Sequence, residues 1–271
     1  MNPIRLVISD IDGTLVDKSK QLTAATADAV LRLEHAKVGF SVISARPRSG
    51  IMPIAETLGI DAPMAAFNGG IIFRRDGTVE EHHVVDPDVV RGVLDLARDE
   101  AVDIWLFADD RWYASRDEGV HVEHERLASN QNPIVTDDFS DYIDRTDKIT
   151  FVSDDHALLK GLAERCAPHA ARATIVQSQV YYLDVTALAG NKGDGARALA
   201  RAFDVPLDAV VAIGDQFNDV PMLDIAGFAI AMGNAPDAVK AKADDVTLAN
   251  DADGVAHAID TLIFPRIGVS A

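Results

Sequence analysis

The strongest constraint on the fold of this chain is an alternation of short apolar runs with amphipathic helical segments. The alternation occurs at both ends of the chain and is interrupted in the middle. The apolar runs of strand length are Ile4–Ser9, Val38–Ile43, Met64–Phe67 and Val210–Ile213. Helical spacing of apolar residues covers 22–37, 47–58 and Lys192–Ala202. Strands that alternate with helices favour a parallel sheet covered on both faces.

The middle of the chain has a different pattern. Ile71–Arg75 and Thr78–Val84 flank Asp76-Gly77, which is typical of a hairpin turn. Short strands paired by turns, with a helix predicted over 87–99 and another over 155–166, then indicate an antiparallel sheet with helices on one face. We therefore predict an α/β fold: a Rossmann-like parallel-sheet core from residues 1–84 and 189–271, with residues 85–188 inserted as an α+β domain.

Composition excludes several classes of protein. Apolar residues make up 48% of the 271 residues and charged residues 25%, which is typical of a soluble globular protein. A formal charge of −18 argues against nucleic acid or anionic membrane as a partner. No apolar run is long enough for a membrane-spanning helix, and the N-terminus lacks the apolar stretch of a secretory signal. The single cysteine, Cys166, fits a reducing compartment, so we expect a cytoplasmic protein, monomeric or homodimeric.

Polar residues follow each predicted strand of the core. Asp10 and Asp12 follow the first strand, Ser44 the second and Asn68 the third. Lys192 begins a helix, and the strand at 210–213 is followed by three more side chains with oxygen ligands: Asp215, Asn218 and Asp219. In open parallel sheets ligands bind at the carboxyl ends of the strands. Carboxylates suit Mg²⁺, and hydroxyl, ammonium and helix-start N–H groups suit a phosphoryl group.

These residues resemble the four motifs of the haloacid dehalogenase-like hydrolase superfamily, in the expected order. Asp10–Leu15 resembles the first motif, Ser44 the second, Lys192 the third, and Gly214-Asp215 with Asn218-Asp219 the fourth. The insertion between the second and third motifs resembles the cap domain of the Cof-type, or class IIB, branch, which contains many phosphatases of sugars and small metabolites. Met232-Gly233-Asn234-Ala235 also resembles that branch.

The resemblance implies a role for each matching residue. Asp10 would be the nucleophile that becomes an aspartyl-phosphate, and Asp12 the general acid and base. Ser44 and Lys192 would bind the transferred phosphoryl group and complete the catalytic set. The implied Mg²⁺ ligands are Asp10, Asp12 through its backbone carbonyl, and Asp215, with Asn218 and Asp219 orienting the metal shell or Lys192. The implied substrate-binding residues are Gly13, Ser44, Ala45, Arg46, Asn68 and Lys192.

Two features of the motifs refine this interpretation. Asp12 favours phosphate esters, because an alkoxide leaving group needs a proton and a halide does not. Relatives commonly have Thr-Gly-Arg where this chain has Ser44-Ala45-Arg46, so the hydroxyl is kept and a Cβ is added beside the phosphate site.

We therefore expect a Mg²⁺-dependent phosphoric monoester hydrolase that acts on a small-molecule phosphate ester, with a sugar phosphate favoured. Two alternatives stay open: a phosphomutase of the same fold, and a binding protein that has lost turnover. Polarity near strand ends suggests Lys148, Gln177, Ser178 and Gln179 as cap residues that contact substrate. The histidine pairs His82-His83 and His121/His124 lack the ligand spacing of a metal site, and Cys166 is interpreted as a buried apolar residue.

Overall fold

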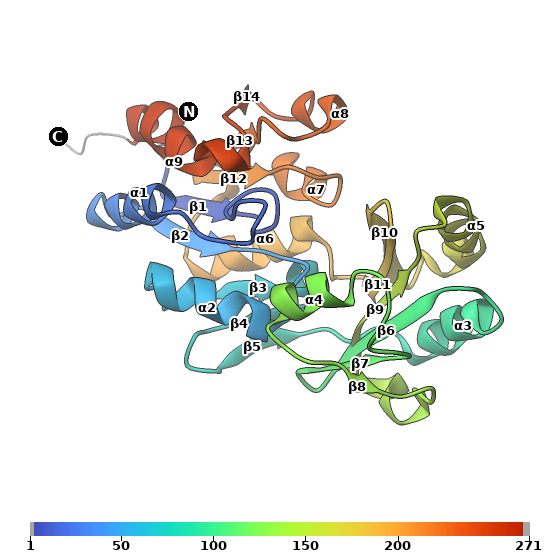
Figure 1. Ribbon diagram of the computed structural model, residues 1–271. Helices are drawn as coiled ribbons and strands as arrows, with labels where there is room; N and C mark the ends of the chain where they lie inside the picture. Colours follow the sequence, from blue (N-terminus) through green and yellow to red (C-terminus); the bar gives the residue numbers. More distant parts are fainter. Residues whose placement is uncertain (1–2, 268–271) are drawn as a thin grey trace.

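A five-stranded parallel sheet forms the centre of the molecule in the computed structural model, which describes residues 3–267 (Figure 1). Its strand order is β14-β13-β12-β1-β2, and every pair in it is parallel. The strands are β1 (Leu6–Ser9), β2 (Gly39–Val42), β12 (Val210–Gly214), β13 (Phe228–Ala231) and β14 (Asp245–Val246). The two outer segments of the sequence thus build one sheet, as the alternating pattern predicts.

Helices cover both faces of this sheet because successive strand residues point to opposite sides. Val7 of β1 packs into the cluster formed with α1 (Ala24–His35), α2 (Arg48–Leu58) and α9 (Gly254–Ala258). Leu6 and Ile8 pack into the opposite cluster, formed with three other helices. Those helices are α6 (Lys192–Ala202), α7 (Val220–Leu223) and α8 (Asp237–Lys240). This two-sided cover confirms the predicted Rossmann-like α/β core.

The strand predicted over Met64–Phe67 does not belong to the parallel sheet in which the alternation of strands and helices placed it. It is β3 (Met64–Ala66), and it belongs to a separate antiparallel sheet with β4 (Ile71–Phe73) and β5 (Val79–His82). A single parallel bridge, between Ile43 and Ala65, connects it to the strand direction of β2. The chain reverses directly after β3, so that one edge of β3 pairs antiparallel with β4 and the other edge bonds to the segment that follows β2.

The middle of the chain forms a six-stranded sheet of order β10-β11-β9-β6-β7-β8. Its strands are β6 (Asp103–Ala108), β7 (Arg111–Ala114), β8 (Ile134–Val135), β9 (Thr146–Val152), β10 (Ala173–Gln179) and β11 (Tyr182–Ala187). All pairs are antiparallel except β7 with β8. One face packs against α3 (Pro87–Ala97) and α5 (His156–Cys166), and the buried Cys166 lies in this cluster. This α+β arrangement is the one predicted for the insertion, whose limits at 84/85 and 188/189 stay a prediction.

The opposite face of this sheet is turned toward the core. Trp105, Phe107 and Tyr182 belong to the same hydrophobic cluster as α1 and α2, whereas Leu183 and Val185 pack with α3 and α5. Helix α4 (Val122–Ser129) lies at this junction and contacts α2 (Figure 1). In the part of the chain that the structure describes, no helix has the length and apolarity to cross a membrane.

Candidate active site

The register of the parallel strands brings the predicted acids together. Ser9 pairs with Ile213 of β12, so Asp10 and Asp215 leave the same edge of the sheet on neighbouring strands. The Asp10 N–H donates to the Ile213 carbonyl at 2.9 Å. On the other side Ser9 pairs with Val42 of β2, which brings Ser44 to the same edge. Residues about 200 positions apart in the sequence therefore meet because parallel strands carry their carboxyl ends to one side.

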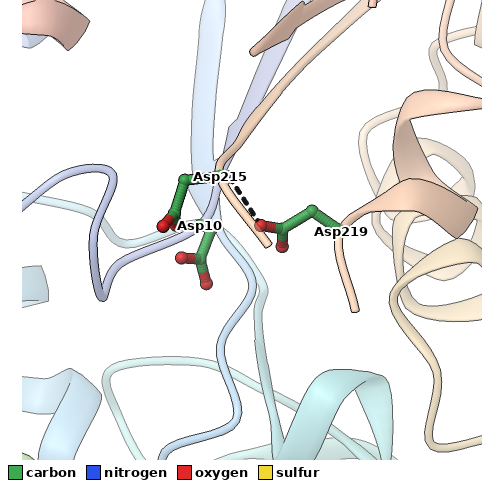
Figure 2. Close-up of side chains that lie close together, drawn as sticks. All are labelled: Asp10, Asp215 and Asp219. Atoms are coloured by element: carbon green, nitrogen blue, oxygen red, sulfur yellow. Dashed lines mark hydrogen bonds between the residues drawn. The ribbon is translucent and has the colours of Figure 1, made fainter. Parts of the chain in front are cut away.

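Three buried carboxylates form a cluster at this edge. Asp10, Asp215 and Asp219 each offer an oxygen that lies within 4.8 Å of the others. Figure 2 shows the three side chains close together. Asp219 precedes α7, and one of its oxygens accepts hydrogen bonds from the N–H groups of Asp215 (2.7 Å) and Gln216 (2.8 Å). Its other oxygen accepts from Lys192 at 2.5 Å. Because both oxygens have donors, Asp219 holds the loop and the lysine in place beside the two other acids.

Lys192 is the only cation that touches this cluster among the described residues. It is 1% exposed, and its ammonium donates to Asp10 and to Asp219. Asn191 caps the helix that starts at Lys192 by accepting from the Asp194 N–H at 3.0 Å. Burial alone would lower the pKa of Lys192, but the charges of Asp10 and Asp219 raise it above its usual value. Lys192 is therefore ionised throughout the physiological range.

The remaining negative charge fits a divalent cation. Burial, opposed by Lys192, raises the pKa of Asp10 to about 7. Burial and the charge of Asp10 raise the pKa of Asp215 to about 8. One ammonium thus faces three carboxylates, and Asp10 and Asp215 present hard oxygens, which Mg²⁺ prefers. The donor set and its excess charge match such an ion.

Thr14 and Asn234, which sequence reasoning did not assign to the site, hold Asp215, and Gly13, a predicted substrate-binding residue, lies against it. Thr14 donates to Asp215 at 3.0 Å, and Asn234 donates to Asp215 at 3.3 Å and to the Gly13 carbonyl at 2.8 Å. Gly13 has a φ of +83° and lies so close to the Asp215 carboxylate that a Cβ has no room. The motif that contains Asn234 can be recognised in the sequence, but no local pattern predicts that the Asn234 side chain reaches the loop that follows β1.

Asp12 lies in a different electrostatic environment from Asp10. Its carboxylate accepts two hydrogen bonds from Arg46, at 2.7 and 2.8 Å, and one from Lys20 at 2.5 Å. Burial would raise the pKa of Asp12, but the hydrogen bonds and charge of Arg46, then of Lys20, hold it well below its usual range. Lys20 was not a predicted site residue. In this arrangement Asp12 is ionised and is poised to accept a proton.

A pocket opens in front of these residues. Its empty volume is about 630 Å³, part of it open to solvent, and it is lined by the loops of the core, by α4 and by the inserted sheet. The lining residues from the core are Asp10, Asp12, Lys20, Ser44, Ala45, Arg46, Gln216 and Asn218. Those from the insertion are His124, Glu125, Ala128, Lys148, Ser178, Gln179, Tyr182 and Asp184.

Comparison with known proteins identifies the family. The family model of haloacid dehalogenase-like hydrolases matches residues 7–259. The chain is a haloacid dehalogenase-like hydrolase. It is 27% identical to the phosphatase YwpJ of Bacillus subtilis (96% of this chain, 100% of the relative). It is 26% identical to the pyridoxal phosphate phosphatase YbhA of Escherichia coli (94% and 97%).

The solved structures support the subclass at the level of the fold. A sugar phosphatase of HAD subclass IIB superposes with a TM-score of 0.83 at 22% identity, over 94% of this chain and 98% of that one. The class IIB resemblance read from the motifs is thus confirmed. Membership of the family, together with phosphatases among its relatives over nearly their full length, makes this hydrolase a phosphoric monoester hydrolase.

Other predicted residues of the hydrolase lie around the same pocket. The Ser44 hydroxyl accepts from the Arg46 N–H at 3.2 Å, and Ala45 contributes its backbone. Asn68 has a φ of +59°, and its side-chain oxygen accepts from Asn218 at 3.3 Å. The Asn218 side chain is thus hydrogen-bonded to Asn68, and its predicted part in the metal shell stays a prediction.

The residues suggested in the insertion divide into two groups. Lys148, Ser178 and Gln179 line the pocket. Gln177 instead donates to the Val180 carbonyl at 2.9 Å, within its own hairpin. Sequence reasoning missed Glu125, Tyr182 and Asp184, because no pattern in the insertion indicates which positions face the core.

Proposed function

We propose that this hydrolase is a Mg²⁺-dependent phosphatase that cleaves small phosphomonoesters through an aspartyl-phosphate at Asp10. The observation that carries the proposal is the juxtaposition of Asp10 with Asp215 and Lys192 at one edge of the sheet, next to Asp12 and Ser44. This set combines a nucleophile, a metal-binding pair, a phosphate-binding cation and a proton carrier in one pocket.

Residues Asp10 and Asp215, with the Asp12 backbone carbonyl, would hold the ion. A bound Mg²⁺ would supply positive charge that offsets the repulsion between the phosphate and the Asp10 carboxylate. Lys192 does the same from the protein side, since its ammonium is fixed against Asp10. Ser44 supplies a hydroxyl for the phosphoryl oxygens.

The reaction would proceed in two displacements at phosphorus. In the first, an Asp10 oxygen forms a bond to phosphorus while the ester P–O bond breaks, and Asp12, in its protonated form, delivers a proton to the leaving oxygen and becomes a carboxylate. In the second, the Asp12 carboxylate takes a proton from water as the water oxygen attacks phosphorus and the Asp10–phosphorus bond breaks, which releases inorganic phosphate and restores Asp10. Arg46 and Lys20, which donate hydrogen bonds to Asp12 and lower its pKa, favour the ionised form that this second displacement requires.

The pocket favours a polar leaving group. Its insertion side carries side chains able to form hydrogen bonds, including Lys148, Ser178 and Gln179. Residues 85–189 carry 21 acidic against 10 basic residues, which favours substrates with a single phosphate. We therefore favour a sugar phosphate as substrate.

The test combines Asp10→Asn with Asp12→Asn, measured on p-nitrophenyl phosphate with Mg²⁺ and with EDTA. Asp10→Asn should abolish turnover. Asp12→Asn should release about one p-nitrophenolate per site in a burst and then stall. The p-nitrophenolate leaving group needs no proton from Asp12, whereas the second displacement needs Asp12 to take a proton from water. Mass spectrometry should find the added phosphoryl group on Asp10.

The matched control is Asp95→Asn on α3, whose side chain is 63% exposed and pairs with Arg98. It should retain wild-type turnover. Turnover that survives Asp10→Asn, or that is the same in EDTA as in Mg²⁺, would refute the proposal. Phosphoryl transfer to a sugar hydroxyl in place of phosphate release would instead indicate a mutase.

A further inference from the structure

The insertion side of the pocket contains a buried acid that the phosphate chemistry does not use. Glu125 lies on α4, is 6% exposed and lines the pocket. Within residues 3–267, its carboxylate has no hydrogen bond and no ion pair. Burial raises the pKa of Glu125 to about 7, and the positive charge of Lys148 opposes this rise. A carboxyl group that lines a pocket without a protein partner is available to accept a hydrogen bond from a ligand.

Tyr182 also lines the pocket, but its hydroxyl does not open into it. The hydroxyl of Tyr182 is inaccessible to solvent and has no hydrogen-bond partner among the described residues. Burial raises the pKa of Tyr182, and the nearby charge of Glu125 raises it further, so the hydroxyl stays protonated. Tyr182 thus contributes an aromatic wall beside Glu125, and the polar group that a ligand could satisfy is the Glu125 carboxylate.

Helix α4 is fixed to the catalytic core, which sets the position of Glu125. Ser49 of α2 donates to the Ser129 carbonyl at 2.6 Å, and Gly50 lies so close to the Ala128 carbonyl that a side chain has no room. Arg46 donates to the Gly50 carbonyl at 3.0 Å while it holds Asp12. The charges of Asp12 and Arg46 also act on Glu125. Glu125 therefore lies on the side of the pocket where the leaving group of a substrate would be protonated.

The cations that line the pocket are already engaged. Arg46 and Lys20 pair with Asp12. Lys148 lies 3.9 Å from Asp184, donates to the Ala45 carbonyl at 3.3 Å and packs over the Phe107 ring. Asp184 also accepts from Thr150 at 2.6 Å. Apart from the phosphoryl site itself, the described residues that line the pocket include no unpaired lysine or arginine that could bind a second anionic group of a substrate. The charge of Glu125 would repel such an anionic group.

We propose that Glu125 forms a leaving-group subsite that binds a hydroxyl group of a polyhydroxylated monophosphate and rejects a leaving group with a second anion. Glu125 would accept a hydrogen bond from a substrate hydroxyl. This inference rests on the proposed phosphatase function and specifies the substrate class that the same pocket selects.

The test uses three six-carbon monophosphates: sorbitol 6-phosphate, 6-phosphogluconate and hexyl phosphate. The first two differ by one terminal carboxylate, and the third lacks the hydroxyls. We expect the wild-type kcat/KM to be highest on sorbitol 6-phosphate, by about 10- to 100-fold, the range of a hydrogen bond to a charged group. Glu125→Gln should lower the ratio of kcat/KM for sorbitol 6-phosphate to kcat/KM for 6-phosphogluconate about tenfold. Glu125→Leu should lower the ratio of kcat/KM for sorbitol 6-phosphate to kcat/KM for hexyl phosphate by a similar factor.

The control is Glu123→Gln on the same helix, whose side chain is 81% exposed and pairs with Arg126. It should leave both ratios of kcat/KM unchanged. Thermal melting checks that each variant is folded, and the near-isosteric Glu125→Gln preserves the packing of α4. If p-nitrophenyl phosphate is hydrolysed but the two ratios are the same in wild type and in both Glu125 variants, the subsite is refuted and the phosphatase function stands. If no phosphate ester is hydrolysed at all, the proposed function fails, and this inference with it.

Discussion

Asp215→Asn should stabilise the metal-free protein even though it damages the site. Asp215 is 3% exposed, and its pKa is raised from 3.8 to about 8 by burial and by the charge of Asp10. Asparagine has the same shape, keeps an acceptor for Thr14 and carries no charge to be buried. The substitution therefore removes a repulsion that the folded metal-free protein has to tolerate.

The size of the effect follows from linkage between protonation and folding. At about 1.36 kcal/mol per pH unit, a rise from 3.8 to about 8 corresponds to at most about 5 kcal/mol at pH 8. Rearrangement and hydration of the neighbouring carboxylates reduce this amount, so we expect about 2–5 kcal/mol. A raised acid pKa means that the folded state binds more protons than the unfolded state. The wild-type protein thus loses stability as pH rises from about 4 to about 8, and the advantage of Asp215→Asn grows over that window.

The assay is urea and thermal unfolding of both proteins between pH 4 and pH 9, in EDTA and in Mg²⁺. In EDTA at pH 8 the melting temperature of Asp215→Asn should exceed that of wild type by roughly 4 °C or more, and near pH 4 the two should coincide. In Mg²⁺ at about 100 times its Kd, wild type should gain about 2.7 kcal/mol that the variant lacks. Asp224→Asn, at a side chain that is 50% exposed, should change neither pattern. An advantage that does not grow with pH, or a wild type that melts identically in EDTA and Mg²⁺, would refute the reasoning.

Two further perturbations test the cations of the site. Lys192→Met leaves Asp10 and Asp219 buried without their counterion, so it should reduce the free energy of unfolding by about 3–5 kcal/mol at pH 7 and by less at pH 5, where Asp10 can protonate. Urea unfolding measures this, with the exposed Lys242→Met as control, and an equal loss at both pH values would contradict it. Lys20→Met removes one of the two cations that lower the pKa of Asp12, so the high-pH limb of kcat/KM for an alkyl phosphate should move to higher pH. This shift of the high-pH limb should be larger for the alkyl phosphate than for p-nitrophenyl phosphate, whose leaving group needs no proton. Identical pH profiles of kcat/KM for wild type and variant would show that Lys20 does not change the pKa of Asp12.

Much of the fold and part of the site follow from local sequence. Strands β1, β2 and β12 and helix α6 occur where apolar spacing predicted them, within a residue or two at each end. Local spacing could not show that β3 would turn back and pair antiparallel with β4, because that depends on which neighbour offers hydrogen bonds. It also could not show that Gln177 bonds within its own hairpin while Ser178 and Gln179 reach the pocket.

The sequence alone determined that Asp10, Ser44 and Asp215 would meet, because parallel strands bring their carboxyl ends to one edge and each of these residues directly follows such a strand. The tertiary structure alone decided that Arg46 and Lys20 hold Asp12 ionised and that Glu125, whose carboxylate has no partner within residues 3–267, lines the same pocket. The physical reason is that the ends of the strands follow from local periodicity. Burial and charge pairing between separate segments, in contrast, are set only when helices and sheets pack together.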